Sequence, residues 1–202
     1  MQAPLISVWK IGMIKNLIPK FDNIVIVGGM ANNILDYLGN PVGKSIKEDN
    51  CKSIIDDIFK TAKNHSCKIV YPKDVAIGKS MEGKAQIKEL NEITNDDLIL
   101  DIGPKTINRI KDIIENSKTV LWNGPAGYFE NENFSHGTIS IAESISKNTF
   151  ERTLVSVLGG GDTLAAINKS KNKLSFSHLS TAGGAFLEYL EGKDLPGLSV
   201  LK

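Results

Sequence analysis

The sequence has 202 residues, of which 41% are hydrophobic and 23% charged, and its formal net charge is +1. This composition is typical of a globular protein, and a chain of this length can bury roughly 70% of the surface that its unfolded form exposes. The small net charge favours neither nucleic acid nor an anionic membrane as a partner, and no apolar run reaches the roughly 18 residues of a membrane-spanning helix.

The N-terminus and the cysteines favour a cytoplasmic location. Residues 1–5 lack the basic stretch and following apolar run of a secretion signal. The two cysteines, Cys51 and Cys67, have no metal-ligand spacing, and we expect them to be free thiols in a reducing compartment.

Apolar runs alternate with amphipathic stretches along most of the chain. The β-branched run 23–27 predicts a fully buried parallel strand, and the helix expected over 30–38 is closed by Gly39. A helical period continues over 46–63. Further strands are expected at 68–71, 98–100, 119–122, 153–158 and 176–179, and further helices at 104–116, 137–147, 162–168 and 184–190.

This alternation predicts a doubly wound, Rossmann-like α/β fold, in which a parallel β-sheet carries helices on both faces. We interpret residues 1–202 as a single domain. The stretch 73–96 fits least well, and its Gly, Lys, Glu and Asn content indicates a long excursion with room for short strands of its own. Ligands of such sheets bind beyond the carboxyl ends of the strands, so the loops there are the candidate sites.

The strongest loop contains three glycines, Gly159 to Gly161, followed by Asp162 and Thr163 and then a helix. Glycines allow the backbone to approach a ligand closely, and the helix start offers N–H groups to an anion. Asp162 would repel a bare phosphate and suits Mg²⁺ on a nucleotide. The alternative is a tight turn in which Asp162 or Thr163 is the helix N-cap.

A second loop covers residues 122–130. Pro125 and Gly127 would make it rigid, and Glu130 is placed to accept hydrogen bonds from ribose hydroxyls. The alternative for Asn123-Gly124 is a hairpin turn. Two weaker loops, at Gly28-Gly29 and at 181–185, also lead from a strand into a helix.

Other phosphate motifs fail on spacing. Residues 39–45 have one residue too few for a Walker A loop, and no Gly-x-Gly-x-x-Gly fingerprint of a dinucleotide site is present. A dinucleotide oxidoreductase is therefore the less favoured alternative for this fold. The three histidines are dispersed without metal-like partners, and we interpret them as structural or surface residues.

Taken in order, the motifs resemble those of the C-terminal, nucleotide-binding domain of phosphoglycerate kinases. The resemblance covers nearly the whole chain, and its most specific segments are Trp-Asn-Gly-Pro and Gly-Gly-Gly-Asp-Thr. The matching segments are 26–32, 43–45, 100–106, 121–127, 159–163, 181–185 and 190–197.

The resemblance implies reversible phosphoryl transfer between MgATP and the carboxyl group of 3-phosphoglycerate, a step of glycolysis. It implies that Gly160, Gly161, Asp162 and Thr163 hold the phosphates of MgATP or MgADP, with Asp162 near Mg²⁺. It further implies that Glu130 binds ribose. The other implied residues are Asn123, Pro125 and Gly127 in the nucleotide pocket, Gly28 and Gly29 in support, Gly183 and Gly184 at the transferring phosphoryl group, and Lys10 at the nucleotide phosphates.

The sequence departs from the family pattern at two places. The N-terminal motif lacks its glycine pair and first lysine, and Lys10 stands one residue late. We interpret residues 1–10 as a remnant of the interdomain hinge region. Ala182 replaces the first glycine of the last loop.

A larger difference is that the family's N-terminal domain, which grips phosphoglycerate, is absent from this sequence. Only two arginines, Arg109 and Arg152, are present, and neither adjoins a glycine loop. Guanidinium groups are the preferred partners of phosphate and carboxylate. We therefore expect 3-phosphoglycerate or 1,3-bisphosphoglycerate to bind only if that domain is supplied, and little activity from this chain alone. The alternatives are a non-catalytic half of a split enzyme and a decayed remnant.

Overall fold

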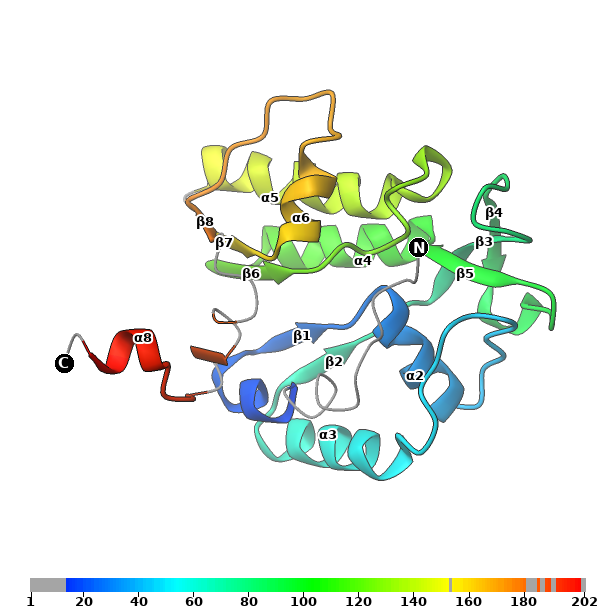
Figure 1. Cartoon of the computed structure of the whole chain (residues 1–202), viewed down its shortest axis with the longest axis horizontal. Helices are drawn as coiled ribbons and strands as arrows, with labels where there is room; N and C mark the ends of the chain where they lie inside the picture. Colours follow the sequence, from blue (N-terminus) through cyan, green and yellow to red (C-terminus); the bar gives the residue numbers. More distant parts are fainter. Residues whose placement is uncertain (1–13, 153, 181–184, 186–187, 190–191, 201–202) are drawn as a thin grey trace. The chain divides into compact units, whose positions relative to one another are not determined.

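The computed structural model describes residues 14–152, 154–180, 185, 188–189, 192–197 and 199–200, with the backbone of 198 (Figure 1). The chain forms two compact units. Unit 1 contains 1–110 and 126–137, and unit 2 contains 111–125 and 138–202. The interpretation of the chain as a single domain stays a prediction.

Unit 1 opens with a short parallel sheet and two helices. Helix η1 (Ile18–Lys20) precedes strand β1 (Asn23–Val25), which pairs in parallel with β2 (Lys68–Val70). Helices α2 (Gly29–Tyr37) and α3 (Lys52–Asn64) connect these strands, and Figure 1 shows α3 beside β2. Their apolar faces form one core, with these residues buried: Ile14, Ile18, Ile26, Ala31, Ile34, Cys51, Ile55, Ile58, Ala62 and Cys67.

Strand β1 is parallel, as predicted, but the prediction of full burial is wrong. Its three residues are only partly buried, and Ile26, just beyond it, is the buried position. The reason is that, among the described residues, β1 has a single neighbouring strand, β2.

The end of α2 agrees with the predicted glycine cap. Gly39 has φ +81°, its N–H donates to the carbonyl of Asp36 at 3.0 Å, and the Asn40 N–H donates to the carbonyl of Leu35 at 2.9 Å. This pair of hydrogen bonds is a Schellman motif, in which a residue of positive φ satisfies the last carbonyls of a helix.

The predicted helix over 46–63 begins too early. Helix α3 starts at Lys52, because Asn50 has φ +62°, which an α-helix does not allow. The segment before it is held by two side chains of α2. Asn32 donates from Nδ2 to the Ile46 carbonyl at 3.0 Å, and Asn33 accepts from the Glu48 N–H at 2.7 Å.

The stretch 73–96 forms short strands of its own, as the sequence indicated. Strand β3 (Asp74–Gly78) pairs antiparallel with both β4 (Gln86–Glu89) and β5 (Leu98–Ile102), and η2 (Leu90–Glu92) links the last two. Val75 and Ile77 of β3 pack with Ile93 in a second buried cluster.

Unit 2 is built on a three-stranded parallel sheet in the order β6-β7-β8. Parallel neighbours need crossover connections, which α5 and α6 supply. Unit 2 contains β6 (Thr119–Asn123), β7 (Val155–Gly159), α6 (Gly161–Ile167), β8 (His178–Ser180), α8 (Pro196–Ser199) and, from Thr138 on, α5 (His136–Glu151). Helix η3 (Glu132–Phe134) belongs to unit 1, and the division between the units falls within α4 (Pro104–Glu115).

The predicted α/β fold, with parallel sheets and helices on both sides, is confirmed. The other predicted helices and strands that fall on described residues are present, with ends shifted by a few residues. Lys10, Gly183 and Gly184, the hinge interpretation of 1–10 and most of the helix expected over 184–190 lie outside the described residues. No helix among the described residues is long and apolar enough to span a bilayer.

Candidate functional site

Unit 2 brings two of the predicted loops to one edge of its sheet. In the register of β6 with β7, Asn123 lies opposite Gly159, so both strands end side by side. The Gly124 N–H donates to the hydroxyl of Thr163 at 2.7 Å, and the Trp122 indole N–H donates to the Gly124 carbonyl at 2.7 Å. The loops after β6 and β7 are therefore joined.

Gly160 allows the loops after β6 and β7 to lie close together. It is the N-cap of α6 with φ +94°, a conformation that side chains rarely adopt. A Cβ at this position would lie 3.2 Å from the Asn123 amide nitrogen and 3.4 Å from the Thr163 hydroxyl. The backbone angle favours glycine at 160, and a side chain there would also press against Asn123.

Neither alternative interpretation of these loops agrees with the structure. Gly160, rather than Asp162 or Thr163, is the N-cap of α6, and it makes no side-chain capping hydrogen bond. The Thr163 hydroxyl accepts from the other loop instead. Asn123-Gly124 is no hairpin turn, because β6 and β7 are parallel.

The N-terminus of α6 is exposed to solvent. Gly161 and Asp162 are exposed, whereas Thr163 is fully buried. A Cβ added at Gly161 would meet no heavy atom of the described residues within 4 Å. The next residue, Asp162, exposes a carboxylate, the kind of oxygen ligand that Mg²⁺ prefers.

The Gly28-Gly29 loop in unit 1 has the predicted strand-to-helix form. Gly28 has φ +63° and is the N-cap of α2, and its carbonyl accepts from the Ala31 N–H at 3.0 Å. Just after β1, the Ile26 N–H donates to the carbonyl of Val70 on β2 at 2.8 Å, which anchors the end of that strand.

Sequence reasoning missed two asparagines that follow this loop. Asn32 and Asn33 are 2% and 4% exposed, and their hydrogen bonds to 46–48 tie α2 to the next segment. Asn32 Oδ1 and Asn33 Nδ2 find no partner within the described part of the chain. An Asn-Asn pair at apolar positions of a helix was the available signal.

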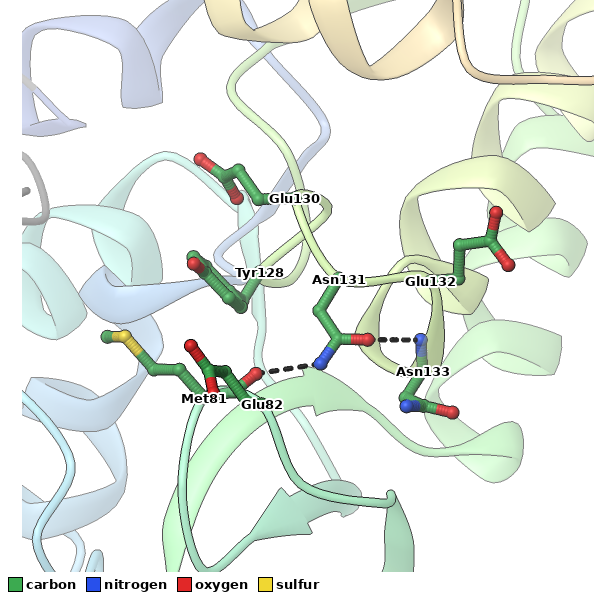
Figure 2. Close-up of a pocket in the computed structure, with 7 residues that line it drawn as sticks. All are labelled: Met81, Glu82, Tyr128, Glu130, Asn131, Glu132 and Asn133. Atoms are coloured by element: carbon green, nitrogen blue, oxygen red, sulfur yellow. Dashed lines mark hydrogen bonds between the residues drawn. The ribbon is translucent and has the colours of Figure 1, made fainter.

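A hollow of about 480 Å³ lies in unit 1 beside the segment that follows Pro125 (Figure 2). It is lined by Met81, Glu82, Tyr128, Glu130, Asn131, Glu132 and Asn133. The Asn131 amide donates to the Met81 carbonyl at 2.8 Å, and its oxygen accepts from the Asn133 N–H at 2.9 Å.

The lining of this hollow suits a neutral group rich in hydroxyls. In Figure 2, Glu130 and Tyr128 project to the same side of the segment, and Glu132 points the other way. Carboxylates accept hydrogen bonds from hydroxyls and repel phosphates. Glu130, expected at ribose from the sequence, is an exposed member of this lining.

Beneath this segment lies a buried carboxyl group, that of Asp101 on β5, which is 3% exposed. Oδ2 accepts from the Gly137 N–H at 2.7 Å and Oδ1 from the Ile102 N–H at 2.8 Å. Burial raises the pKa of Asp101 to about 7, although the hydrogen bonds from Gly137 and Ile102 lower it. Gly127, expected in the nucleotide pocket, packs on this carboxyl group.

Two further buried carboxyl groups have structural roles. Asp74 accepts from the N–H groups of Lys105 and Thr106, at 2.9 and 2.8 Å, and so caps α4. Asp97 pairs with Lys79 and Lys88 at 2.7 and 2.8 Å. Burial raises the pKa of Asp97, but the hydrogen bonds from the two lysines and Thr94 outweigh it and hold the pKa well below its usual range.

The structure thus divides the predicted residues between the two units. One edge in unit 2 brings together Asn123, Gly160, Gly161, Asp162 and Thr163, and Pro125 stands two positions after Asn123. Gly28, Gly29, Gly127 and Glu130 belong to unit 1. No cluster of three metal-ligating side chains is found within the described ranges.

Fold and loops together define an α/β protein whose parallel strands end in glycine-rich loops. The family model of phosphoglycerate kinase matches residues 8–193. Phosphoglycerate kinases from Zymomonas mobilis and Xanthobacter autotrophicus are 42% and 43% identical over 195 residues, which is 96% of this chain and 49% of each relative.

Solved structures agree with these sequence matches. The structure of phosphoglycerate kinase from Coxiella burnetii has a TM-score of 0.87 and 37% identity, with 96% of this chain and 50% of that chain covered. That from Pyrococcus horikoshii has a TM-score of 0.77 and 26% identity, with 99% and 50% covered. This chain belongs to the phosphoglycerate kinase family, and it spans about half the length of the relatives it matches.

Proposed function

We propose that this chain is the nucleotide-binding half of a phosphoglycerate kinase and that it binds ATP or ADP together with Mg²⁺. The observation that carries the proposal is the hydrogen bond between Gly124 and Thr163, which joins two of the family's loops into one open edge. The family match over 8–193 supports it.

The phosphates would lie at the start of α6. Gly160 and Gly161 leave the backbone accessible, and the exposed Asp162 would hold Mg²⁺ directly or through water. Bound Mg²⁺ would neutralise phosphate charge and orient the transferring group. Lys10 would add a positive charge to the phosphates, and Gly183-Gly184 would face the transferring phosphoryl group.

The nucleoside would be held by the rest of the predicted set. Glu130 and the hollow beside it offer acceptors for ribose hydroxyls. Asn123, Pro125 and Gly127 would shape the pocket, with Gly28 and Gly29 in support.

In the full reaction, a phosphoryl group would pass reversibly between MgATP and the carboxyl group of 3-phosphoglycerate, in glycolysis in the cytoplasm. The acceptor would be gripped by the other half of the family's fold, because this chain has only two arginines, Arg109 and Arg152. Phosphoryl transfer depends on positioning both reactants. The chain alone should therefore turn over poorly.

The nucleotide part is tested by isothermal titration of ADP with and without Mg²⁺. We expect D162N to weaken the binding of MgADP by about tenfold, or ~1.4 kcal/mol, and to remove most of the Mg²⁺ dependence. The matched control is D112N, which removes the same charge from an exposed position of α4. Equal affinities of D162N and D112N for MgADP would contradict a role of Asp162 in holding Mg²⁺.

The acceptor part is tested by a coupled assay with 3-phosphoglycerate. We expect a rate near background from the chain alone, and a higher rate after addition of the N-terminal half of a relative, such as that from Zymomonas mobilis. A full rate without that half would show that the chain carries its own acceptor site.

A further inference from the structure

The carboxyl group of Asp101 is wedged between two glycines of one segment. The Gly137 N–H donates to Oδ2 at 2.7 Å. A Cβ added at Gly127 would lie 2.4 Å from Oδ1, and one added at Gly137 would lie 2.3 Å from the same atom. Both glycines are needed for this contact, which reaches the segment Ala126–Gly137 near its two ends.

Strand β5 anchors the same segment through a second residue. The Tyr128 N–H donates to the Leu100 carbonyl at 2.6 Å, one position before Asp101. Within the segment, Phe134 is fully buried, and its N–H donates to the Asn131 carbonyl at 3.0 Å. Most of the lining of the hollow comes from this part of the segment, namely from Tyr128 and Glu130 to Asn133.

We propose that Asp101 is a positioning residue: its buried carboxyl group fixes both ends of Ala126–Gly137 and so holds Glu130 and the hollow ready for the hydroxyl-bearing part of the nucleotide. This role rests on the proposed function. A site that is already formed binds more tightly, because the ligand does not have to select a minor conformation.

Replacement by asparagine tests the role with little change in shape. An amide has one acceptor oxygen, whereas the carboxyl group accepts from the N–H groups of both Gly137 and Ile102. D101N therefore leaves one buried N–H facing an NH₂ group, which is costly. The matched control is D74N, because Asp74 is equally buried, on the neighbouring strand β3, and caps α4 without a hydrogen bond to the segment.

The first measurement is amide hydrogen exchange on the free chain. In D101N we expect the amides of Tyr128, Phe134 and Gly137 to exchange at least tenfold faster, while the amides between β3 and β5 keep their rates. In D74N the faster amides should be those of Lys105 and Thr106. Unchanged exchange over 126–137 in D101N would overturn the inference, whatever the chain binds.

The second measurement is the affinity for MgADP of the same variants. We expect a loss of at least tenfold in D101N and less than twofold in D74N. Faster exchange with unchanged affinity in D101N would overturn the link to the nucleotide. If the unmutated chain binds no MgADP while exchange behaves as expected, the proposed function fails and Asp101 still holds the segment.

If D101N does not fold, a variant that keeps Asp101 offers another measurement. Titration of Asp101 should move the amide resonances of Gly137 and Glu130 with one midpoint. Tyr128, Glu130, Glu132 and His136 are the titratable side chains of the segment, and β3 presents Ala76 opposite Asp101. The titration is therefore made in H136N, and a Glu130 resonance that does not follow that of Gly137 would contradict the proposal.

Discussion

The hydroxyl of Thr163 accepts a hydrogen bond from the backbone N–H of Gly124 at 2.7 Å, although the two residues stand 39 positions apart. Thr163 is fully buried and Gly124 is partly buried, so the acceptor end of this bond is shielded from water. It joins the loop after β6 to the first turn of α6 and sets the shape of the proposed phosphate site.

Replacement of Thr163 by valine removes the hydroxyl and keeps the size of the side chain. The Gly124 N–H then loses its acceptor, and we expect the free energy of unfolding to fall by about 1–3 kcal/mol. The measurement is urea denaturation followed by circular dichroism. T163S keeps the hydroxyl, and its free energy of unfolding should fall clearly less. Equal losses in T163V and T163S would show that the hydrogen bond does not stabilise the loop.

Gly160 and Gly161 form a matched pair for substitution by alanine. Gly160 has φ +94° and a close neighbour in Asn123, whereas Gly161 has open space around its Cα. We expect G160A to cost roughly 1–3 kcal/mol of unfolding free energy and G161A to change it by less than about 0.5 kcal/mol. A G160A variant as stable as G161A would contradict the backbone account of this loop.

The buried carboxyl group of Asp97 should matter more than either of its lysine partners. Its side chain is fully buried, while those of Lys79 and Lys88 are 63% and 14% exposed. We expect D97N to lower the unfolding free energy by about 3 kcal/mol, because it leaves the mostly buried ammonium group of Lys88 without its counter-charge. K79M should lower the unfolding free energy by less than ~1 kcal/mol, because the Lys79 side chain is mostly exposed. A larger loss in K79M than in D97N would contradict the central role of the Asp97 carboxyl group.

Asp97 and Asp101 should give opposite pH dependences of stability. The lowered pKa of Asp97 adds stability above its unfolded value near 4, and that contribution is lost as the pH falls further. The raised pKa of Asp101, about 7, means that the folded state holds a proton which the unfolded state releases. The contribution of Asp101 to the free energy of unfolding is therefore present below pH ~4, and it is lost as the pH rises to about 7.

Denaturation of D101N and the unmutated chain between pH 4 and 8 checks this sign. The difference in unfolding free energy between the two should change by a few kcal/mol at most, and in the direction that favours D101N as the pH rises to about 7. A constant difference over that range would show that Asp101 keeps its ordinary pKa.

The sequence predicted those features that depend on neighbours along the chain. Alternating apolar runs marked the parallel strands, and the glycines after β1, β6 and β7 marked the strand ends that lead into helices or into the segment beside the hollow. The glycine cap at Gly39 was likewise a local signal, and the structure confirms it.

Features that depend on distant partners were missed. Helix α3 starts at Lys52 rather than Ile46 because Asn50 has a positive φ, and the segment before it is held by Asn32 and Asn33. No local period reveals these features. Asp101 looked like one member of a motif until the fold placed Gly127 and Gly137 against its carboxyl group. The parallel pairing of β6 and β7, which excludes a hairpin at Asn123, also emerges only from the sheet.

The proposal that this chain holds the nucleotide of a phosphoglycerate kinase is tested most directly by titration of MgADP into the unmutated chain. We predict saturable binding of one MgADP per chain, displaced by MgATP, with shifts in the amide resonances of Gly124, Gly161 and Glu130. Absence of binding at millimolar concentration, or binding that leaves those three resonances in place, would contradict it.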